Sequence, residues 1–272
     1  RLPAIDPRFV GGVIAVALLV ALNVYLFLLT DWSMLRGDPG ADWTIFGEAG
    51  RRASSGGDLY AVEDAYAFRY SPLLAHAFAA LHVMGPLAWR ALHVAAVASL
   101  AWVDTRLALV TLLAWPFWFD VEAGNLMAFT FVLAAWALAG RGWAIGGFFI
   151  LGLLVPRPLA LPIIVWLLWK HPAWRLPFVG LFIVHAAAVL ATGWGPAWVA
   201  ALAASTAETG SALNFGPSRL IGAVWIPIGL VLAAILTWRG RLGLASLAAS
   251  PYWLPYYFLM PLLDLRRDPR RG

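Results

Sequence analysis

FVGGVIAVALLVALNVYLFLLT, which forms residues 9–30, contains no charged side chain over its whole length. A helix needs about 20 consecutive apolar residues to cross the hydrocarbon core of a bilayer, and this stretch supplies them. No cleavage site of small residues stands out at its end, as a removable signal peptide would require. The stretch therefore predicts a retained transmembrane helix.

The rest of the chain has the same apolar character. Of its 272 residues, 62% are hydrophobic and only 12% are charged, whereas soluble domains carry roughly 25% charged residues. This composition argues against a soluble enzyme, a nucleic-acid-binding domain and a secreted disulfide scaffold. Cysteine is absent, so thiolate metal sites and thiol nucleophiles are excluded. The formal net charge of +5 is typical of basic cytoplasmic loops in membrane proteins.

Apolar blocks recur along the chain, at 72–84, 88–103, 106–119, 123–140, 143–155, 158–170, 174–192, 219–238 and 241–264. They predict an all-α polytopic membrane protein that forms a single transmembrane domain over 1–272, with about nine transmembrane helices. Block 72–84 is too short to cross, because a helix of its length reaches only about 20 Å. We therefore expect it to lie in the external interface.

The last block, 241–264, carries Pro251 and Pro255 at its centre. Two prolines this close break a helix, and broken backbone at membrane depth is tolerated only inside protein or beside a watery cavity. We expect this block to turn back on itself and to face a site. The tail then stays on the side where the block begins.

The orientation follows from the basic residues, which favour the cytoplasmic side. With the N-terminus inside and 72–84 not crossing, one side collects Arg106, Arg141, Lys170, Arg175, Arg239, Arg241 and the tail residues Arg266, Arg267, Arg270 and Arg271. The other side receives a first external loop, 31–70, which holds seven of the fourteen acidic residues, and a second external loop, 193–217. The first loop includes interfacial helices.

Short motifs follow one another in a fixed order, namely Asp42-Trp43, Gly56-Gly57-Asp58-Leu59-Tyr60, Phe68-Arg69-Tyr70-Ser71-Pro72-Leu73, Gly124-Asn125, Pro156-Arg157-Pro158 and Ser250-Pro251-Tyr252 with Pro255-Tyr256. This order, over residues 40–265, resembles the GT-C superfamily of glycosyltransferases. More narrowly, it resembles the polyprenyl-phosphate-mannose-dependent alpha-mannosyltransferases of glycosyltransferase family 87. Asn125 stands where that family usually has Gln, and Arg157 stands where it has Lys.

The resemblance implies a GT-C-like fold and a hexosyltransferase activity, most narrowly an alpha-mannosyltransferase. The donor would be a polyprenyl-phosphate sugar lipid, and the acceptor a glycan or glycolipid on the external face of a bacterial cytoplasmic membrane. The transfer would invert the anomeric centre, generally without a metal, and would need no cofactor. Membrane lipids would be partners and nucleic acid would not.

Glycosyl transfer from a lipid phosphate needs a base for the acceptor hydroxyl and a cation for the leaving phosphate. Asp42 is the candidate base; the alternative is a helix N-cap or a solvated loop acid. Arg157 is the candidate phosphate ligand, because it is the sole charge between Trp143 and Trp169. The alternative for Arg157 is snorkelling to the interface. Arg69 is a second phosphate candidate.

Candidate acceptor- or sugar-binding residues are Asp120, Glu122, Asn125, Tyr60 and Tyr252. Asp120 and Glu122 have a plain alternative, in which they cap a helix that starts near Ala123. The five histidines are scattered without a carboxylate at ligand spacing, and no metal motif is predicted.

Two other classes of function remain open. The chain is shorter than typical members of the family that it resembles, which favours a non-catalytic GT-C-like scaffold or a membrane subunit that pairs with another protein. The second is a transporter of lipid-linked sugars. Transporters usually show inverted repeats, and the acidic loop 31–70 has no counterpart in the second half.

Overall fold

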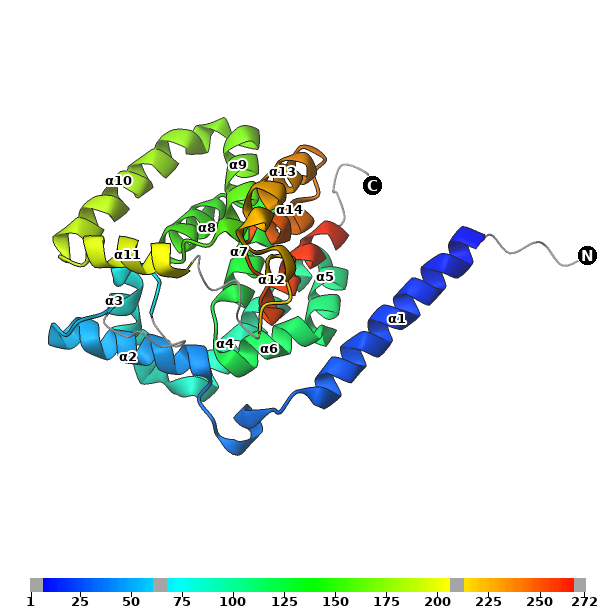
Figure 1. Ribbon diagram of the computed structural model, residues 1–272, viewed down its shortest axis with the longest axis horizontal. Helices are drawn as coiled ribbons and strands as arrows, with labels where there is room; N and C mark the ends of the chain where they lie inside the picture. The colour runs from blue at the N-terminus through cyan, green and yellow to red at the C-terminus, as the bar shows by residue number, and fades with distance from the viewer. Residues whose placement is uncertain (1–6, 61–67, 206–212, 267–272) are drawn as a thin grey trace, which may run out of the picture.

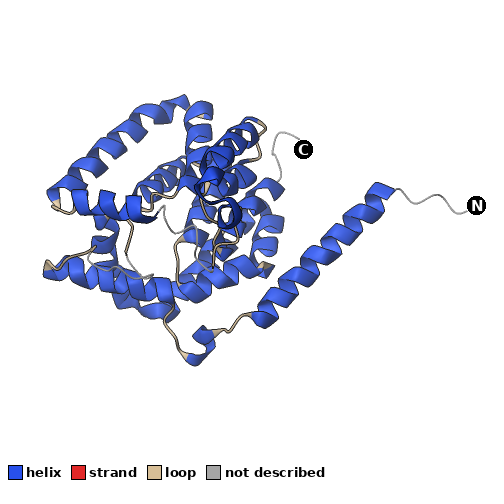
Figure 2. Ribbon diagram, in the orientation of Figure 1, coloured by secondary structure: helices blue, strands red, loops and turns tan. Residues whose placement is uncertain are grey.

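The computed structural model describes residues 7–60, 68–205 and 213–266. Within these ranges the protein is helical and has no strand, as predicted (Figure 2). The α-helices are α1 (Pro7–Leu29), α2 (Ala41–Ser55), α3 (Pro72–Leu81), α4 (Gly85–Ala98), α5 (Ala101–Leu113), α6 (Trp115–Ala123), α7 (Met127–Leu138), α8 (Gly142–Leu154), α9 (Leu161–Lys170), α10 (Arg175–Ala191), α11 (Gly195–Ser205), α12 (Ser218–Ile221), α13 (Trp225–Trp238) and α14 (Leu242–Ala249). The 3₁₀ helices are η1 (Ser33–Arg36), η2 (His82–Met84), η3 (Pro158–Ala160), η4 (Pro172–Trp174), η6 (Gly222–Val224) and η7 (Pro255–Leu265).

Four helical stretches are long and apolar enough to cross a membrane, namely Gly11–Arg36, Pro72–Ala98, Pro172–Ala191 and Ser218–Trp238. Shorter apolar helices cover parts of 127–138, 142–154, 158–170 and 195–204. The described residues thus form a helical membrane protein with four candidate spans, and nine crossings are not shown. One candidate span joins α3 to α4 through η2, whereas the sequence separates the interfacial block 72–84 from the next crossing.

Several helix boundaries differ from the predicted blocks, and two of these differences lie at the two ends of α6. Block 106–119 is broken at Ala114, where α5 ends and α6 begins. Block 123–140 does not start a helix at Ala123 as expected. Instead α6 ends there, Gly124 caps it with a left-handed φ of 72°, and α7 begins at Met127. The left-handed conformation is one that glycine adopts without steric cost.

The first helix, α1, stands apart from the other helices over most of its length (Figure 1). Its contact with them is polar. The Asn23 side chain donates to the Leu113 carbonyl at 3.1 Å and accepts from the Trp115 amide at 2.7 Å. These are two of the backbone groups that the break at Ala114 leaves without helical partners. Asn23 therefore satisfies a broken backbone that apolar surroundings would otherwise penalise.

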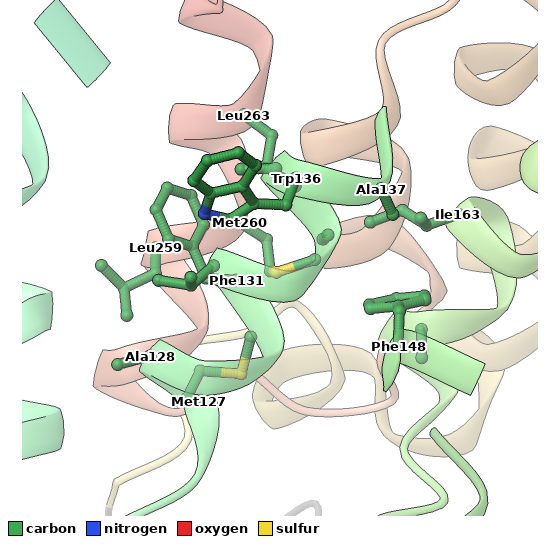
Figure 3. Packing of buried hydrophobic residues seen from close by; sticks show 14 of the residues in the cluster. Met127, Ala128, Phe131, Trp136, Ala137, Phe148, Ile163, Leu259, Met260 and Leu263 are labelled. Atoms are coloured by element: carbon green, nitrogen blue, oxygen red, sulfur yellow. The ribbon is translucent and has the colours of Figure 1, made fainter. Parts of the chain in front are cut away.

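The main core is built around α7. Helix α7 contacts η7, where Leu259 and Met260 lie beside Phe131, and on another side α8, which contributes Phe148 near Ala137 (Figure 3). A second cluster joins α2 to α3, where the rings of Phe46 and Phe78 stack with centroids 4.5 Å apart. The second cluster fixes the position of α2, the helix that carries Asp42.

The segment from α14 to η7 is a hairpin, as the two prolines predict. Its two ends are joined because the Asp264 carboxylate accepts hydrogen bonds from the amides of Gly243 and Leu244, at 2.9 Å and 3.0 Å. The turn between them, residues 250–254, is not helical. The expectation that 241–264 turns back on itself is confirmed.

Candidate functional site

Asp42 lies in the first turn of α2 and points one carboxylate oxygen at Asn125. Its Oδ2 accepts a hydrogen bond of 2.6 Å from Asn125 Nδ2. Its Oδ1 has no hydrogen-bond partner among the described residues. The N-cap of α2 is Gly40, and no side chain caps this helix. Asp42 is therefore not the helix cap of the alternative interpretation; one of its oxygens is held and the other is available.

The chain conformation before Asp42 brings α2 close to α6. Gly40 has a φ of 96°, and a Cβ added there would lie 2.5 Å from the Glu122 carbonyl oxygen. A side chain at this position would push the two helices apart. Glycine at position 40 therefore permits the approach that lets Asp42 reach Asn125.

Asn125 connects the carboxylate of Asp42 to the guanidinium of Arg157. It is completely buried. Its Nδ2 donates to Asp42, and its Oδ1 accepts from Arg157 Nη2 at 3.2 Å and from the Leu126 amide at 2.6 Å. A carboxamide carries its donor and its acceptor on separate atoms, so one side chain can bridge an anion and a cation. Because Asn125 lies between them, Asp42 and Arg157 form no direct ion pair in the described structure.

Arg157 lies in the break between α8 and η3, flanked by Pro156 and Pro158. Its Nη2 also donates to the hydroxyl of Tyr70. The guanidinium carbon lies over three tyrosine rings, 5.2 Å from the ring centroid of Tyr70, 5.6 Å from that of Tyr256 and 5.3 Å from that of Tyr257. Cation–π contacts of this kind stabilise a cation away from water. The side chain is thus held in a defined interior position, which the snorkelling interpretation does not predict.

The electrostatics of Asp42 suit a base. Burial raises the pKa of its carboxyl, while the hydrogen bond from Asn125 and the charge of Arg157 lower it. A carboxylate with a raised pKa binds a proton more readily than one in water. Asn125 and Arg157 keep the ionised form accessible.

Two buried residues, His93 and Asp120, support the position of Asn125. Both are completely buried. The two ring nitrogens of His93 lie 2.7 Å from the Asn125 carbonyl oxygen and 2.8 Å from the Trp89 carbonyl oxygen. Asp120 Oδ2 lies 3.6 Å from His93 Nε2. These contacts fix the main chain at Asn125.

Asp120 also caps α7, since its Oδ2 accepts from the Ala128 amide at 2.8 Å. Burial raises the pKa of Asp120, and the hydrogen bond from the Ala128 amide opposes this effect. The net result is a pKa of about 7. Asp120 thus stabilises the first turn of α7, which begins at Met127. The alternative interpretation placed Asp120 and Glu122 at the start of a helix near Ala123, but both lie in α6, which ends there. The structure does not place the Asp120 carboxylate on an accessible surface.

Glu122 and Tyr60 are engaged in local support. The Glu122 carboxylate accepts from the Ser33 hydroxyl and from the Met34 amide, at 3.1 Å for the latter, and so holds η1. The Tyr60 hydroxyl donates to the Tyr70 carbonyl oxygen at 2.8 Å, which positions the residue that contacts Arg157. Arg69, next to Tyr70 in the chain, is partly exposed.

Tyr252 belongs to the group of tyrosines around Arg157. Its ring stacks on Tyr257 with centroids 6.0 Å apart. The sequence motifs include Tyr252 but not Tyr257. The position of Tyr257, two residues after Pro255, is the feature of the sequence that could have identified it. His93 is also absent from the sequence-based set, because a single histidine in an apolar helix gives no sign of what it touches.

Comparisons of the chain with protein-family models, with curated proteins and with solved structures gave no match.

Proposed function

We propose that this chain is an integral membrane glycosyltransferase that moves a sugar, mannose by the resemblance of its motifs, from a polyprenyl-phosphate donor to a hydroxyl of a glycan or glycolipid. The observation that carries the proposal is the hydrogen-bonded series Asp42–Asn125–Arg157. It holds a base and a phosphate-binding cation at a fixed separation, and these are the two groups that the reaction needs.

In this reaction the acceptor oxygen attacks the anomeric carbon of the donor sugar. Asp42 Oδ1 takes the hydroxyl proton as the new C–O bond forms. The bond from the anomeric carbon to the phosphate oxygen breaks, and its electron pair stays on the polyprenyl phosphate. Arg157 stabilises the charge that develops there. A single displacement of this kind inverts the anomeric centre.

Asn125 has two roles in this scheme. It orients Asp42 so that Oδ1 is available, and it separates the carboxylate from the guanidinium. A direct ion pair would depress the basicity of Asp42 and occupy the N–H groups that the phosphate needs. His93 fixes the main chain of Asn125 and is a positioning residue.

We further propose nine membrane-embedded elements, of which the ninth is the returning hairpin 241–264, with the N-terminus and the tail in the cytoplasm. An external interfacial helix lies at 72–84, and the site lies on the external face of a bacterial cytoplasmic membrane. The charge pattern assigns loop 31–70 and the turn 120–125 to the external side. Contacts among these segments support that assignment, because Asp42 bonds to Asn125 and Glu122 bonds to Ser33.

The test of the phosphate role is donor affinity in Arg157→Ala and Arg157→Lys. A hydrogen bond to a charged group is worth about 1.5–3 kcal/mol, so Arg157→Ala should weaken the binding of polyprenyl phosphate by roughly tenfold to a hundredfold. Arg157→Lys should lose less, because it keeps the charge. Arg106→Ala, an exposed arginine away from the site, is the control.

Binding is measured by isothermal titration in detergent, with helix content checked by circular dichroism for each variant. Unchanged affinity in a folded Arg157→Ala protein would contradict the phosphate role. It would favour the non-catalytic scaffold among the alternatives.

A further inference from the structure

A cavity of about 420 Å³ opens along one flank of α2. Four of its lining residues, Ala41, Thr44, Glu48 and Arg52, recur every three or four positions and so share one face of the helix. The cavity begins at Gly40 and Ala41, the residues directly before Asp42. Its size lies within the range of small-molecule sites, about 300–1,000 Å³.

The polar side of the cavity is dominated by two acids. Asp38 is fixed in place, because its Oδ1 accepts from the Gly40 amide at 2.8 Å and its main-chain oxygen accepts from Arg90 at 2.6 Å. Its Oδ2 has no partner among the described residues. Glu48 is paired with two arginines, Arg51 and Arg52, at 2.7 Å and 2.8 Å. The hydrogen bond from Arg51 is the largest effect that lowers the pKa of Glu48, to about 2, so this acid is ionised at neutral pH.

Apolar side chains also line the cavity. Ile45, Leu59 and Phe68 line it, and the last two are buried. A cavity lined by carboxylates and by apolar side chains suits a sugar ring, which has hydroxyl donors on its edge and C–H groups on its faces. An ionised carboxylate accepts hydrogen bonds and donates none. The cavity lining carries two carboxylates and one arginine, Arg52. This excess of negative charge disfavours the binding of a phosphate.

The cavity adjoins the proposed catalytic site through an aromatic wall. Phe68 packs edge-on against Tyr70 with ring centroids 5.5 Å apart, and the Tyr70 hydroxyl accepts from Arg157. We infer that this cavity binds the sugar that accepts the transferred residue, with Asp38 and Glu48 as ligands of its hydroxyl groups. The inference rests on the proposed function and assigns to it a binding site for the acceptor.

The inference is tested with a substitution that fills the cavity. Thr44→Phe places a ring in the lining, and Ser54→Phe on the same helix is the matched control, because Ser54 is exposed and does not line the cavity. The two hydroxyls make equivalent bonds, Thr44 to the Gly40 carbonyl and Ser54 to the Gly50 carbonyl, both at 2.9 Å. Each substitution therefore loses one such bond. Asp38→Asn keeps the shape and removes the charge.

The probe is methyl α-D-mannopyranoside, followed by saturation-transfer difference NMR on the purified protein in detergent. We expect binding to wild type and Ser54→Phe, and at least tenfold weaker binding to Thr44→Phe and to Asp38→Asn. Equal binding by Thr44→Phe and wild type, or no binding by wild type, would overturn the inference.

The role of Arg157 in donor binding and the role of the cavity in acceptor binding can be tested separately. If Thr44→Phe keeps its sugar affinity while Arg157→Ala loses the polyprenyl phosphate, the cavity inference is wrong and the proposed function stands. If Thr44→Phe loses the sugar while Arg157→Ala keeps the polyprenyl phosphate, the cavity is a sugar site and the assignment of the donor site is wrong.

Discussion

The hydrogen bond from Asn125 favours the ionised form of Asp42. Burial raises the pKa of Asp42, and the hydrogen bond from Asn125 is the larger of the two effects that lower it. In the proposed transfer Asp42 acts as an ionised carboxylate, so kcat/KM should fall as the pH drops through this pKa. Asn125→Ala removes the hydrogen bond, and the pKa should then rise further.

The acid limb of the pH–rate profile should therefore move to higher pH in Asn125→Ala. A hydrogen bond of about 1.5–3 kcal/mol to a charged group corresponds to roughly one to two pH units. The comparison is kcat/KM for wild type and variant from pH 4 to pH 8. An acid limb that stays in place, or moves to lower pH, would show that Asn125 does not stabilise the working base.

At the residue scale, the sequence singles out Asp42 and Arg157 as candidate site residues. It does not predict the residues that they contact. Arg157 stands out in the sequence because it is the sole charge in an apolar run, and Asp42 stands out because it begins the series of motifs. The bond from Asp42 to Asn125 spans 83 positions and that from Arg157 to Asn125 spans 32, so neither has a periodic signal. His93 is missed for the same reason: its partner, the Asn125 carbonyl, belongs to another helix junction.

Helix packing makes its closest approach in the hairpin of α14 and η7. A Cβ added to Gly243 would lie 2.2 Å from the Met260 carbonyl oxygen, a backbone atom that cannot move aside. Gly243→Ala should therefore destabilise the protein by about 1–3 kcal/mol, the usual cost of overpacking. Gly180→Ala in α10 is the control, because nothing lies within 4 Å of the added Cβ.

Gly180→Ala should be neutral or stabilising by about 0.5–1 kcal/mol, since alanine is the better helix former. Thermal unfolding in detergent measures both variants. Equal stability of the two would mean that α14 and η7 do not pack as closely as described.

Helix boundaries were predictable where an apolar block is uninterrupted. The bounds of α8 and α10 agree with blocks 143–155 and 174–192 to within one residue. The junction at Ala114 was not predicted, because apolar residues continue through it. A boundary near 120–122 was predicted from its acids, but α6 continues through them and ends at Ala123. The backbone groups at Ala114 are satisfied by Asn23, a residue of α1 about 90 positions away. Composition within a block does not reveal such a partner.

For the whole molecule, the proposed topology makes a prediction about access. The chain has no cysteine, so each introduced cysteine is unique. Cysteines at the exposed positions Ser55 and Ala204 should react with a membrane-impermeant maleimide in intact cells. Cysteines at the exposed positions Arg141 and Arg175 should react only after the membrane is opened. Protection of Ser55→Cys in intact cells would contradict an external site.

The central claim is that Asp42 is the base of a glycosyl transfer. The most direct measurement uses radiolabelled polyprenyl-phosphate mannose with the purified protein, and offers methyl α-D-mannopyranoside and a bacterial lipid extract as acceptors. Asp42→Asn keeps the shape of the side chain and removes the base. Asp31→Asn makes the same change at an exposed carboxylate of the same loop and is the control.

We predict that wild type and Asp31→Asn transfer the label to an acceptor. Asp42→Asn should transfer it at least about 10²-fold more slowly while still binding the donor. Transfer by Asp42→Asn at the wild-type rate would contradict the assignment of the base, and no transfer by the wild-type protein to either acceptor would contradict the proposed activity.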